Sequence, residues 1–325
     1  MNQGQWVLHV DRREAVVRAE AGVLTVRAPG RPTERFPVRE LATLILSGSP
    51  RIDGFTLRAL GEAEVATVFV GGRQSQAASW LAQGLGGSIR LRHAQHLAHA
   101  DPLRRLTIAR WVIAAKLQAC ADVAKQLGWT TESGASLAAI ERLQACTDMA
   151  ALQGLEGSCA ARWFGALRRA IPESWGFQGR ERRPPPCPTN ALLSFLYAVI
   201  ASETQMVVQG LGLDPSVGFL HAMVPGRPAL VLDAMEGLRP GCDAIVLTLL
   251  LDGRLAPSAF RQADGGCMMD KDARAALMTA FAAARSAWPG SGLPLGTLLR
   301  RHAREQARQI DTEAAGEEMG DVGDT

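Results

Sequence analysis

Residues 103–121 read LRRLTIARWVIAAKLQACA, and their pattern decides how the larger part of the chain folds. Apolar residues recur every three or four positions, which is the spacing of one face of an amphipathic helix over several turns. This apolar face is formed by Leu103, Leu106, Ala109, Val112, Ile113, Leu117 and Ala121. The rest of the helix surface is expected to carry Arg104, Arg105, Arg110 and Lys116. Helical periodicity dominates from about residue 95 onward.

Toward the C-terminus, the pattern predicts further helices over residues 136–147 and 149–170 and a long apolar helix that begins at Asn190. Before that helix, residues 180–188 read RERRPPPCP. This segment cannot be helical, because proline lacks the backbone donor and excludes the helical conformation from the residue before it. We therefore expect an exposed basic loop there.

The first 70 residues differ from the rest because short apolar or alternating runs favour strands. Strands are predicted over residues 6–10, 15–19, 22–27, 35–38, 41–46 and 65–70, with a short helix over 55–63. The chain is thus predicted to have an α+β fold, in which a small N-terminal β-rich domain precedes a larger all-α domain. The predicted bounds are 1–88 for the β-rich domain, 89–310 for the α-helical catalytic domain and 311–325 for a disordered acidic tail.

Composition indicates a globular protein, since 47% of the residues are apolar and 21% are charged. We predict a soluble cytoplasmic protein, because no apolar run reaches the roughly 18 residues of a membrane span and the start lacks a secretory signal. The six cysteines form no Cys-x-x-Cys pair, so we expect them to be reduced and buried, with neither zinc nor an iron–sulfur cluster. The net charge is only +3, but the acidic end segment hides a more basic, arginine-rich remainder.

Three places in the helical half carry residues suited to chemistry. Glu156 begins a stretch of small and apolar neighbours, and it also fits an ordinary first-turn residue of a helix. His221 follows a loop shaped by Gly210, Gly212 and Gly218, although a histidine beside apolar residues is often a satisfied core residue. Asp233 and Glu236 are expected on one face of a helix that Pro240 ends, either as ligands, as partners of Arg239 or on a surface helix.

Taken together, two or three carboxylates and one histidine without a thiolate form a ligand set that suits Mg²⁺ or Mn²⁺ better than structural zinc. A metal of this kind, with open positions for water and phosphate oxygens, fits phosphodiester chemistry. Sequence spacing alone does not show that these side chains meet in space.

The segment from Asn190 to Pro240 resembles the signature core of the Cas1 family of CRISPR adaptation integrases. The matching segments are NALLSFLY at 190–197, GLDP at 212–215, GFLH at 218–221, LVLDAME at 230–236 and LRP at 238–240. Upstream, residues 155–164, LEGSCAARWF, resemble the first catalytic motif of the family. The blocks occur in the family's order, and weaker similarity covers most of the chain. Trp163 departs from the family's usual tyrosine, and Arg274–Ala275 departs from an expected Arg-Lys pair.

The resemblance implies that Glu156, His221 and Glu236 are the catalytic residues and ligate Mg²⁺ or Mn²⁺, with Asp233 as an auxiliary acidic residue. It implies DNA strand transfer without an external energy source, in which 3′-hydroxyls of a double-stranded prespacer attack the CRISPR repeat boundary. The expected partners are a second copy of the chain, a Cas2 protein that bridges two dimers and, in some systems, a Cas4 nuclease. Candidate contacts to the DNA backbone are Arg162, Arg168, Arg169, Arg180, Arg182, Arg183 and Arg239.

Two other functions remain open on sequence grounds: an integrase of a mobile element and a DNA-binding assembly scaffold without catalytic activity. The former usually carries an added DNA-binding domain, and retention of all three candidate ligands argues against the latter. Tyr197 is the only tyrosine, and its place in a predicted core helix favours packing over nucleophilic attack.

Overall fold

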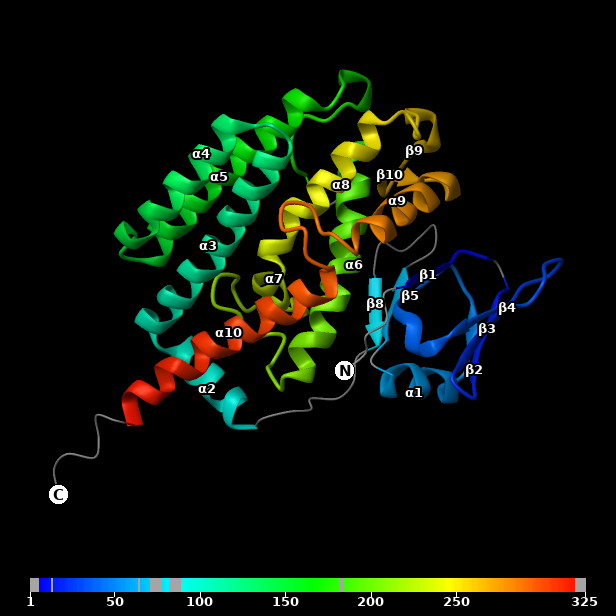
Figure 1. Cartoon of the computed structure of the whole chain (residues 1–325), viewed down its shortest axis with the longest axis horizontal. Helices are drawn as coiled ribbons and strands as arrows, with labels where there is room; N and C mark the ends of the chain where they lie inside the picture. The colour runs from blue at the N-terminus through cyan, green and yellow to red at the C-terminus, as the bar shows by residue number, and fades with distance from the viewer. Residues whose placement is uncertain are drawn as a thin grey trace. The chain divides into compact units, whose positions relative to one another are not determined.

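The computed structural model describes residues 6–12, 14–63, 65–70, 78–81, 89–181 and 184–318. For residues 70, 78–81 and 312–318 it describes the backbone only. The chain forms two compact units (Figure 1). The first comprises residues 1–83, 173–206 and 248–286, and the second comprises 84–172, 207–247 and 287–325. One unit change, at 83/84, lies near the predicted boundary at residue 88, but the chain then returns to the first unit twice. These returns were not predicted: segments 173–206 and 248–286 group with the N-terminal residues.

The first unit contains two four-stranded sheets in the N-terminal region. One has the order β1-β5-β7-β8, with β1 and β7 parallel to β5 and β8 antiparallel to β7; the other has the order β4-β3-β2-β6. The elements are β1 (Trp6–Val10), β2 (Val16–Glu20), β3 (Val23–Arg27), β4 (Glu34–Pro37), β5 (Leu41–Ser47), β6 (Arg51–Ile52), α1 (Gly54–Glu62), β7 (Ala66–Val70) and β8 (Ala78–Leu81). The predicted β-rich start is confirmed.

The burial pattern of the strands follows their place in the sheets. β5 lies between two neighbours and is buried at six of its seven residues, and five of the seven are apolar, as suits a strand covered on both faces. β2 and β3 instead alternate buried with more exposed residues, as strands with one covered face do. Val17, Leu24, Leu41, Leu44 and Leu60 are fully buried in the resulting core.

The first unit also takes in later parts of the chain: most of α6 (Pro188–Gly210), the end of α8 (Arg239–Leu251), a hairpin of β9 (Phe260–Ala263) and β10 (Gly266–Met269), and α9 (Lys271–Ala284). The hairpin was not predicted. By length and apolar composition alone, α6 is able to cross a membrane, contrary to the expectation from sequence. However, 67% of its most apolar window is buried inside the molecule, which is the pattern of a core helix.

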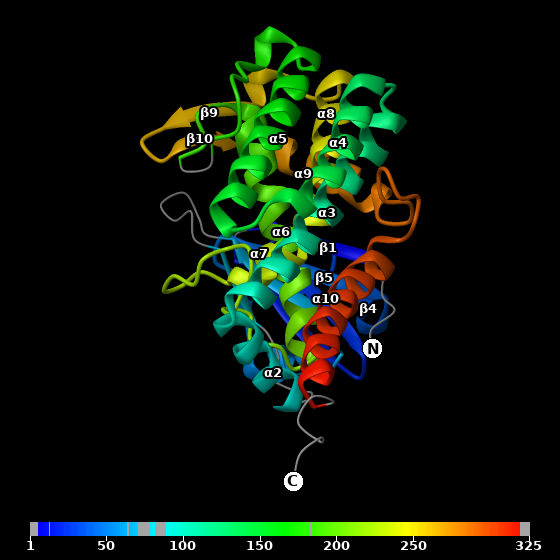
Figure 2. The same ribbon diagram turned by 90° about the vertical axis from the view of Figure 1, so that its left-hand side faces the viewer.

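The second unit is helical and holds α2 (Ile89–Ala100), α3 (Pro102–Gln126), α4 (Thr130–Arg142), α5 (Met149–Ala170), α7 (Ala229–Ala234), the 3-10 turn η4 (Glu236–Leu238) and α10 (Leu295–Glu318). α3, α4 and α5 lie side by side (Figures 1 and 2). The predicted α+β class is therefore confirmed, with the larger part of the chain helical. α10 continues to Glu318, into the segment predicted as a tail, and residues 319–325 lie outside the described residues.

Local signals fix where α3 and α5 begin. The Asp101 side chain accepts hydrogen bonds from the backbone N–H groups of Leu103 and Arg104, at 2.8 and 3.2 Å, at the start of α3. The Asp148 side chain accepts from Ala151 N at 2.8 Å at the start of α5. Such caps satisfy N–H groups that have no partner within the helix. A shared core then packs the two helices together, with Leu106, Val112, Ile113, Leu117, Leu152 and Leu155 buried in it.

The segment around Asp233 corrects one prediction. Asp233 lies near the end of α7, whereas Glu236 begins η4, so they do not share one continuous helix. Pro240 does not end a helix either, because α8 begins at Arg239 and Pro240 lies in its first turn. Proline is tolerated there, since first-turn N–H groups have no helical partner to lose. The resulting turn between α7 and α8 points Glu236 toward α3.

Candidate active site

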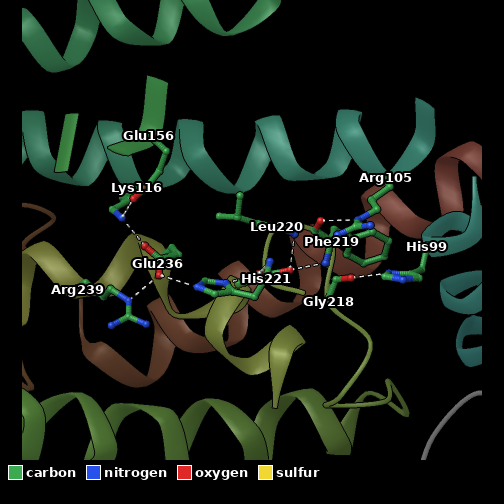
Figure 3. A network of polar contacts seen from close by, with 11 residues as sticks. His99, Arg105, Lys116, Glu156, Gly218, Phe219, Leu220, His221, Glu236 and Arg239 are labelled. Atoms are coloured by element: carbon green, nitrogen blue, oxygen red, sulfur yellow. Dashed lines mark hydrogen bonds and ion pairs between the residues drawn. The ribbon is translucent and has the colours of Figure 1, made fainter. Parts of the chain in front are cut away.

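Charged side chains from three separate elements of the second unit meet at Lys116 (Figure 3). Lys116 on α3 places its Nζ atom 2.5 Å from Oε1 of Glu156 on α5 and 2.8 Å from Oε2 of Glu236 on η4. The side chains of Lys116 and Glu156 are 18% and 27% exposed, while that of Glu236 is 4% exposed. The lysine therefore joins two carboxylates that are 80 residues apart in the sequence.

His221 lies beside the same group. Its Nε2 atom is 3.9 Å from Oε1 of Glu236, and its Nδ1 atom is 2.7 Å from Oδ1 of Asp233. An ionised carboxylate only accepts hydrogen bonds, so Nδ1 carries a proton, and Nε2 is the ring nitrogen that faces Glu236. This is how an acidic neighbour fixes the tautomer of a metal-ligating histidine.

Asp233 also holds the backbone that carries His221. Its Oδ2 atom accepts from the N–H groups of Phe219 and Leu220 at 2.5 and 3.1 Å, and Oδ1 accepts from that of His221 at 3.0 Å. The side chain of Asp233 is fully buried. Both of its oxygens are thus engaged by the loop, and the structure places Asp233 behind His221 rather than beside Lys116.

Side chains from α2 and α3 hold the same loop from another side. Gln95 binds it through three hydrogen bonds, donating to the carbonyls of Asp214 and Val217 and accepting from Asp214 N. Nδ1 of His99 lies 2.6 Å from the carbonyl oxygen of Gly218, and Nε of Arg105 donates to that of Phe219 at 3.0 Å (Figure 3). A loop fastened at so many points presents His221 in one defined position.

Glu236 is kept ionised despite its burial. Burial alone would raise the pKa of its carboxyl group, but Arg239, Lys116 and His221 outweigh burial and hold that pKa well below its ordinary value. Arg239 Nε lies 2.7 Å from Glu236 Oε1, and Lys116 Nζ faces the other oxygen. Conversely, the two glutamates raise the pKa of Lys116 above its ordinary value, even though burial opposes this. The site therefore retains its charges at neutral pH.

The structure brings the three predicted ligands together. Glu156 and Glu236 contact one atom from two sides, at 2.5 and 2.8 Å, so their nearer oxygens are at most about 5.3 Å apart. Glu156 lies in the middle of α5, so its alternative interpretation as a first-turn residue is wrong. The alternative of a pair with Arg239 is correct for Glu236. Within the described residues, no three His, Cys, Asp or Glu side chains already surround one point as metal ligands.

The predicted DNA-contacting arginines occupy different environments. Arg162 and Arg168 are exposed on α5, and exposed Arg169 pairs with Glu132 at 2.7 Å. Arg180 donates to the side chains of Asn190 and Ser194, both at 3.0 Å, and Arg239 is buried against Glu236. Arg182 and Arg183 lie outside the described residues. Arg162 and Arg168 are therefore the best placed of the set to meet a ligand from solvent.

Two aromatic residues have packing partners. Tyr197 is buried, and the guanidinium carbon of Arg180 lies 5.3 Å from its ring centroid. Trp163, at the position where a tyrosine was expected, donates from Nε1 to Asp243 Oδ2 at 2.7 Å. Both positions support a structural role for the ring.

Sequence reasoning placed Lys116 on the outer surface of its helix and missed its contacts. The signal was present in the spacing: Val112 and Cys120, four positions to either side of Lys116, are both buried. Lys116 is also one of only three lysines in a chain rich in arginine. The loop-holding roles of Gln95, His99 and Arg105 gave no comparable signal.

Two carboxylates and an imidazole nitrogen on one partly buried patch can hold Mg²⁺ or Mn²⁺, which prefer oxygen ligands and accept imidazole. The position of Lys116 supports this fit, because a cation already satisfies both carboxylates at the point that they share. All ligand candidates lie in the second unit.

Comparison with known proteins gives consistent matches. The family model described as "CRISPR associated protein Cas1" matches residues 8–283. A relative from Thermus thermophilus, named CRISPR-associated endonuclease Cas1 1, is 31% identical over 275 residues, covering 84% of this chain and 85% of the relative. A casposase bound to an integration product has a TM-score of 0.81 at 18% identity, covering 94% of this chain and 91% of that chain. A chain of a Cas6-RT-Cas1–Cas2 complex has a TM-score of 0.75 at 19% identity, covering 96% of this chain and 35% of its own length. At these identities, the structural likeness establishes the shared fold.

Proposed function

The chain belongs to the Cas1 family of CRISPR-associated proteins, and on that premise we propose that it is a DNA integrase and endonuclease of CRISPR adaptation. Its reaction is metal-dependent strand transfer that inserts prespacers at the CRISPR repeat boundary. The observation that carries the proposal is the convergence of Glu156 with His221 and Glu236, which follow it by 65 and 80 positions in the sequence, on one partly buried patch.

Glu156, His221 and Glu236 are proposed as the ligands of Mg²⁺ or Mn²⁺. A divalent ion bound there supplies Lewis-acid stabilisation of the charge that develops on the phosphate during phosphodiester exchange. The chain's own residues orient the ligands: Asp233 holds Nδ1 of the His221 ring, and Arg239 neutralises one oxygen of Glu236. The 3′-hydroxyl of the prespacer is the nucleophile, so the protein needs no nucleophilic side chain.

DNA binding is proposed to be electrostatic and directed at the backbone, with Arg162 and Arg168 as the principal contacts of α5. Each phosphate contact that is lost should lower the slope of log affinity against log salt by about 1. The proposed partners are double-stranded prespacer and repeat DNA, a second copy of this chain and a Cas2 protein, all in the cytoplasm. Help from a Cas4 nuclease is compatible with the same chemistry.

The test is the joining of a labelled duplex to a supercoiled plasmid that carries a CRISPR repeat, with Mn²⁺ or Mg²⁺ and with EDTA. Glu156→Gln, His221→Asn and Glu236→Gln should each reduce joining at least about 100-fold, the scale on which lost metal ligands or their supports act. DNA binding, measured by fluorescence anisotropy, should be retained. Glu141→Gln is the matched control, because Glu141 is exposed on α4 of the same unit.

Joining by any of the three variants at the wild-type rate would remove that residue from the ligand set. Binding of DNA without joining by the wild-type protein would instead support the assembly-scaffold alternative. Joining that ignores the repeat sequence would support the mobile-element alternative.

A further inference from the structure

We propose that Lys116 is a positioning residue of the metal site: its ammonium group holds Glu156 and Glu236 together, and it leaves their shared oxygens when a divalent ion binds. The inference rests on the proposed function, because it takes these two carboxylates to be metal ligands. It adds a residue that acts through the ligands rather than as one of them.

The first step of the argument is the position of Lys116. Nζ lies 2.5 Å from Glu156 Oε1 and 2.8 Å from Glu236 Oε2, so a single ammonium bridges both carboxylates. The lysine backbone is fixed, because neighbouring residues such as Ile113 and Leu117 are buried in the core that joins α3 to α5. Figure 3 shows the ammonium between Glu156 and Glu236.

The second step is the balance of charge. Two carboxylates at most about 5.3 Å apart repel each other, and one of them is almost fully buried. Arg239 contacts Glu236 Oε1, which leaves Glu156 and the second oxygen of Glu236 to Lys116. Lys116 therefore keeps the carboxylates facing each other, an arrangement that their own repulsion opposes.

The third step is geometric competition. The carboxylates that would hold a divalent ion are the same two that Nζ contacts at 2.5 and 2.8 Å, so the ammonium occupies the place that the ion needs. An ammonium and a divalent cation cannot share that volume, and their repulsion is strong at a partly buried site. Lysine can withdraw because its four-carbon stem is flexible while α3 stays in place. Its side chain is also 18% exposed, so it is not sealed from solvent.

The experiment measures Mn²⁺ affinity by isothermal titration calorimetry on full-length protein that has been stripped with EDTA. Lys116→Met should bind Mn²⁺ at least about tenfold more tightly than wild type, since the competing positive charge is gone. Lys116→Arg keeps the positive charge, so its Mn²⁺ affinity should lie within about threefold of the wild-type affinity or below it. Lys125→Met, an exposed lysine on the same helix, is the matched control and should match wild type.

Thermal unfolding provides a second measurement that a purely structural lysine would not reproduce. Without added metal, Lys116→Met should melt at a lower temperature than wild type, and saturating Mn²⁺ should raise its melting temperature by more than it raises that of wild type. A residue that merely packs would lower both temperatures equally. If Lys116→Met does not fold, Lys116→Gln takes its place in both measurements.

The outcomes separate the inference from the function on which it rests. If the wild-type protein binds no Mn²⁺, or if Glu156→Gln leaves binding unchanged, the proposed metal site is wrong. If the wild type binds Mn²⁺ through Glu156 but Lys116→Met binds equally or more weakly, the metal site stands and the displacement of Lys116 is refuted.

Discussion

Replacement of Asp233 by asparagine should loosen the loop that carries His221, even when no metal is added. The aspartate accepts four hydrogen bonds, from the N–H groups of Phe219, Leu220 and His221 and from the His221 ring. Asparagine keeps the shape but offers only one acceptor oxygen, so two of the four buried donors lose their partner. An unsatisfied buried donor costs about 1–3 kcal/mol, which gives a loss of about 4 kcal/mol for Asp233→Asn.

Hydrogen exchange measures this loss where it arises. A loss of about 4 kcal/mol corresponds to roughly a thousandfold faster exchange of the Phe219, Leu220 and His221 amides, provided that the loop opens locally. Asp214→Asn is the matched control, because Asp214 caps Ser216 N in the same loop from a more exposed position. It should change exchange at 219–221 by less than about tenfold.

The reasoning is refuted if Asp233→Asn leaves these amides protected while Mn²⁺ affinity falls strongly. That result would make Asp233 a direct ligand whose contacts to the loop matter little. The exchange measurement is made in EDTA, so a missing ligand cannot imitate a missing loop acceptor.

Two further predictions concern the region behind Glu236. Burial, with a smaller effect of Arg301, lowers the pKa of His302 from 6.5 to about 4. The unfolded chain therefore takes up this proton first, so the stability contribution is complete above pH 6.5 and is lost as the pH falls to about 4. His302→Gln should remove about 3 kcal/mol of that pH dependence, measured by urea unfolding. Gly237→Ala should lower the free energy of unfolding by about 1–3 kcal/mol, because the added Cβ would lie 2.3 Å from His302 Cε1. In the control Gly157→Ala, the Cβ added to α5 meets nothing within 4 Å, so the free energy of unfolding should rise by up to about 1 kcal/mol. Thermal unfolding measures both. A Gly237→Ala protein as stable as wild type would show that η4 can shift away from His302 without cost.

Local sequence signals predicted the elements that depend on local physics. The bounds of β1 and α5 match their predicted ranges, because strand alternation, helical spacing and the caps lie within a few residues of the element. The short strands β6 and β8 and the β9–β10 hairpin were missed, because two to four residues are too few for a periodic pattern.

The candidate site depended on resemblance more than on pattern. Spacing alone left Glu156, His221 and Glu236 as three isolated possibilities, each with an ordinary alternative. Whether Lys116 faces solvent is decided by α5 and η4, which are 40 and 120 positions away in the sequence. Likewise, nothing near Asp233 in the sequence indicates that its carboxylate will meet three successive backbone amides.

The helical unit takes residues 84–172, 207–247 and 287–325 from three separate passes of the chain, and the candidate site uses the first two of them. A nascent polypeptide that has left the ribosome only as far as residue 206 already contains Lys116 and Glu156, yet it lacks His221 and Glu236. The charged centre is therefore completed late in synthesis, once the second pass has docked. A truncated translation product that stops between the two passes should be inert toward DNA cleavage, however well its first segment folds.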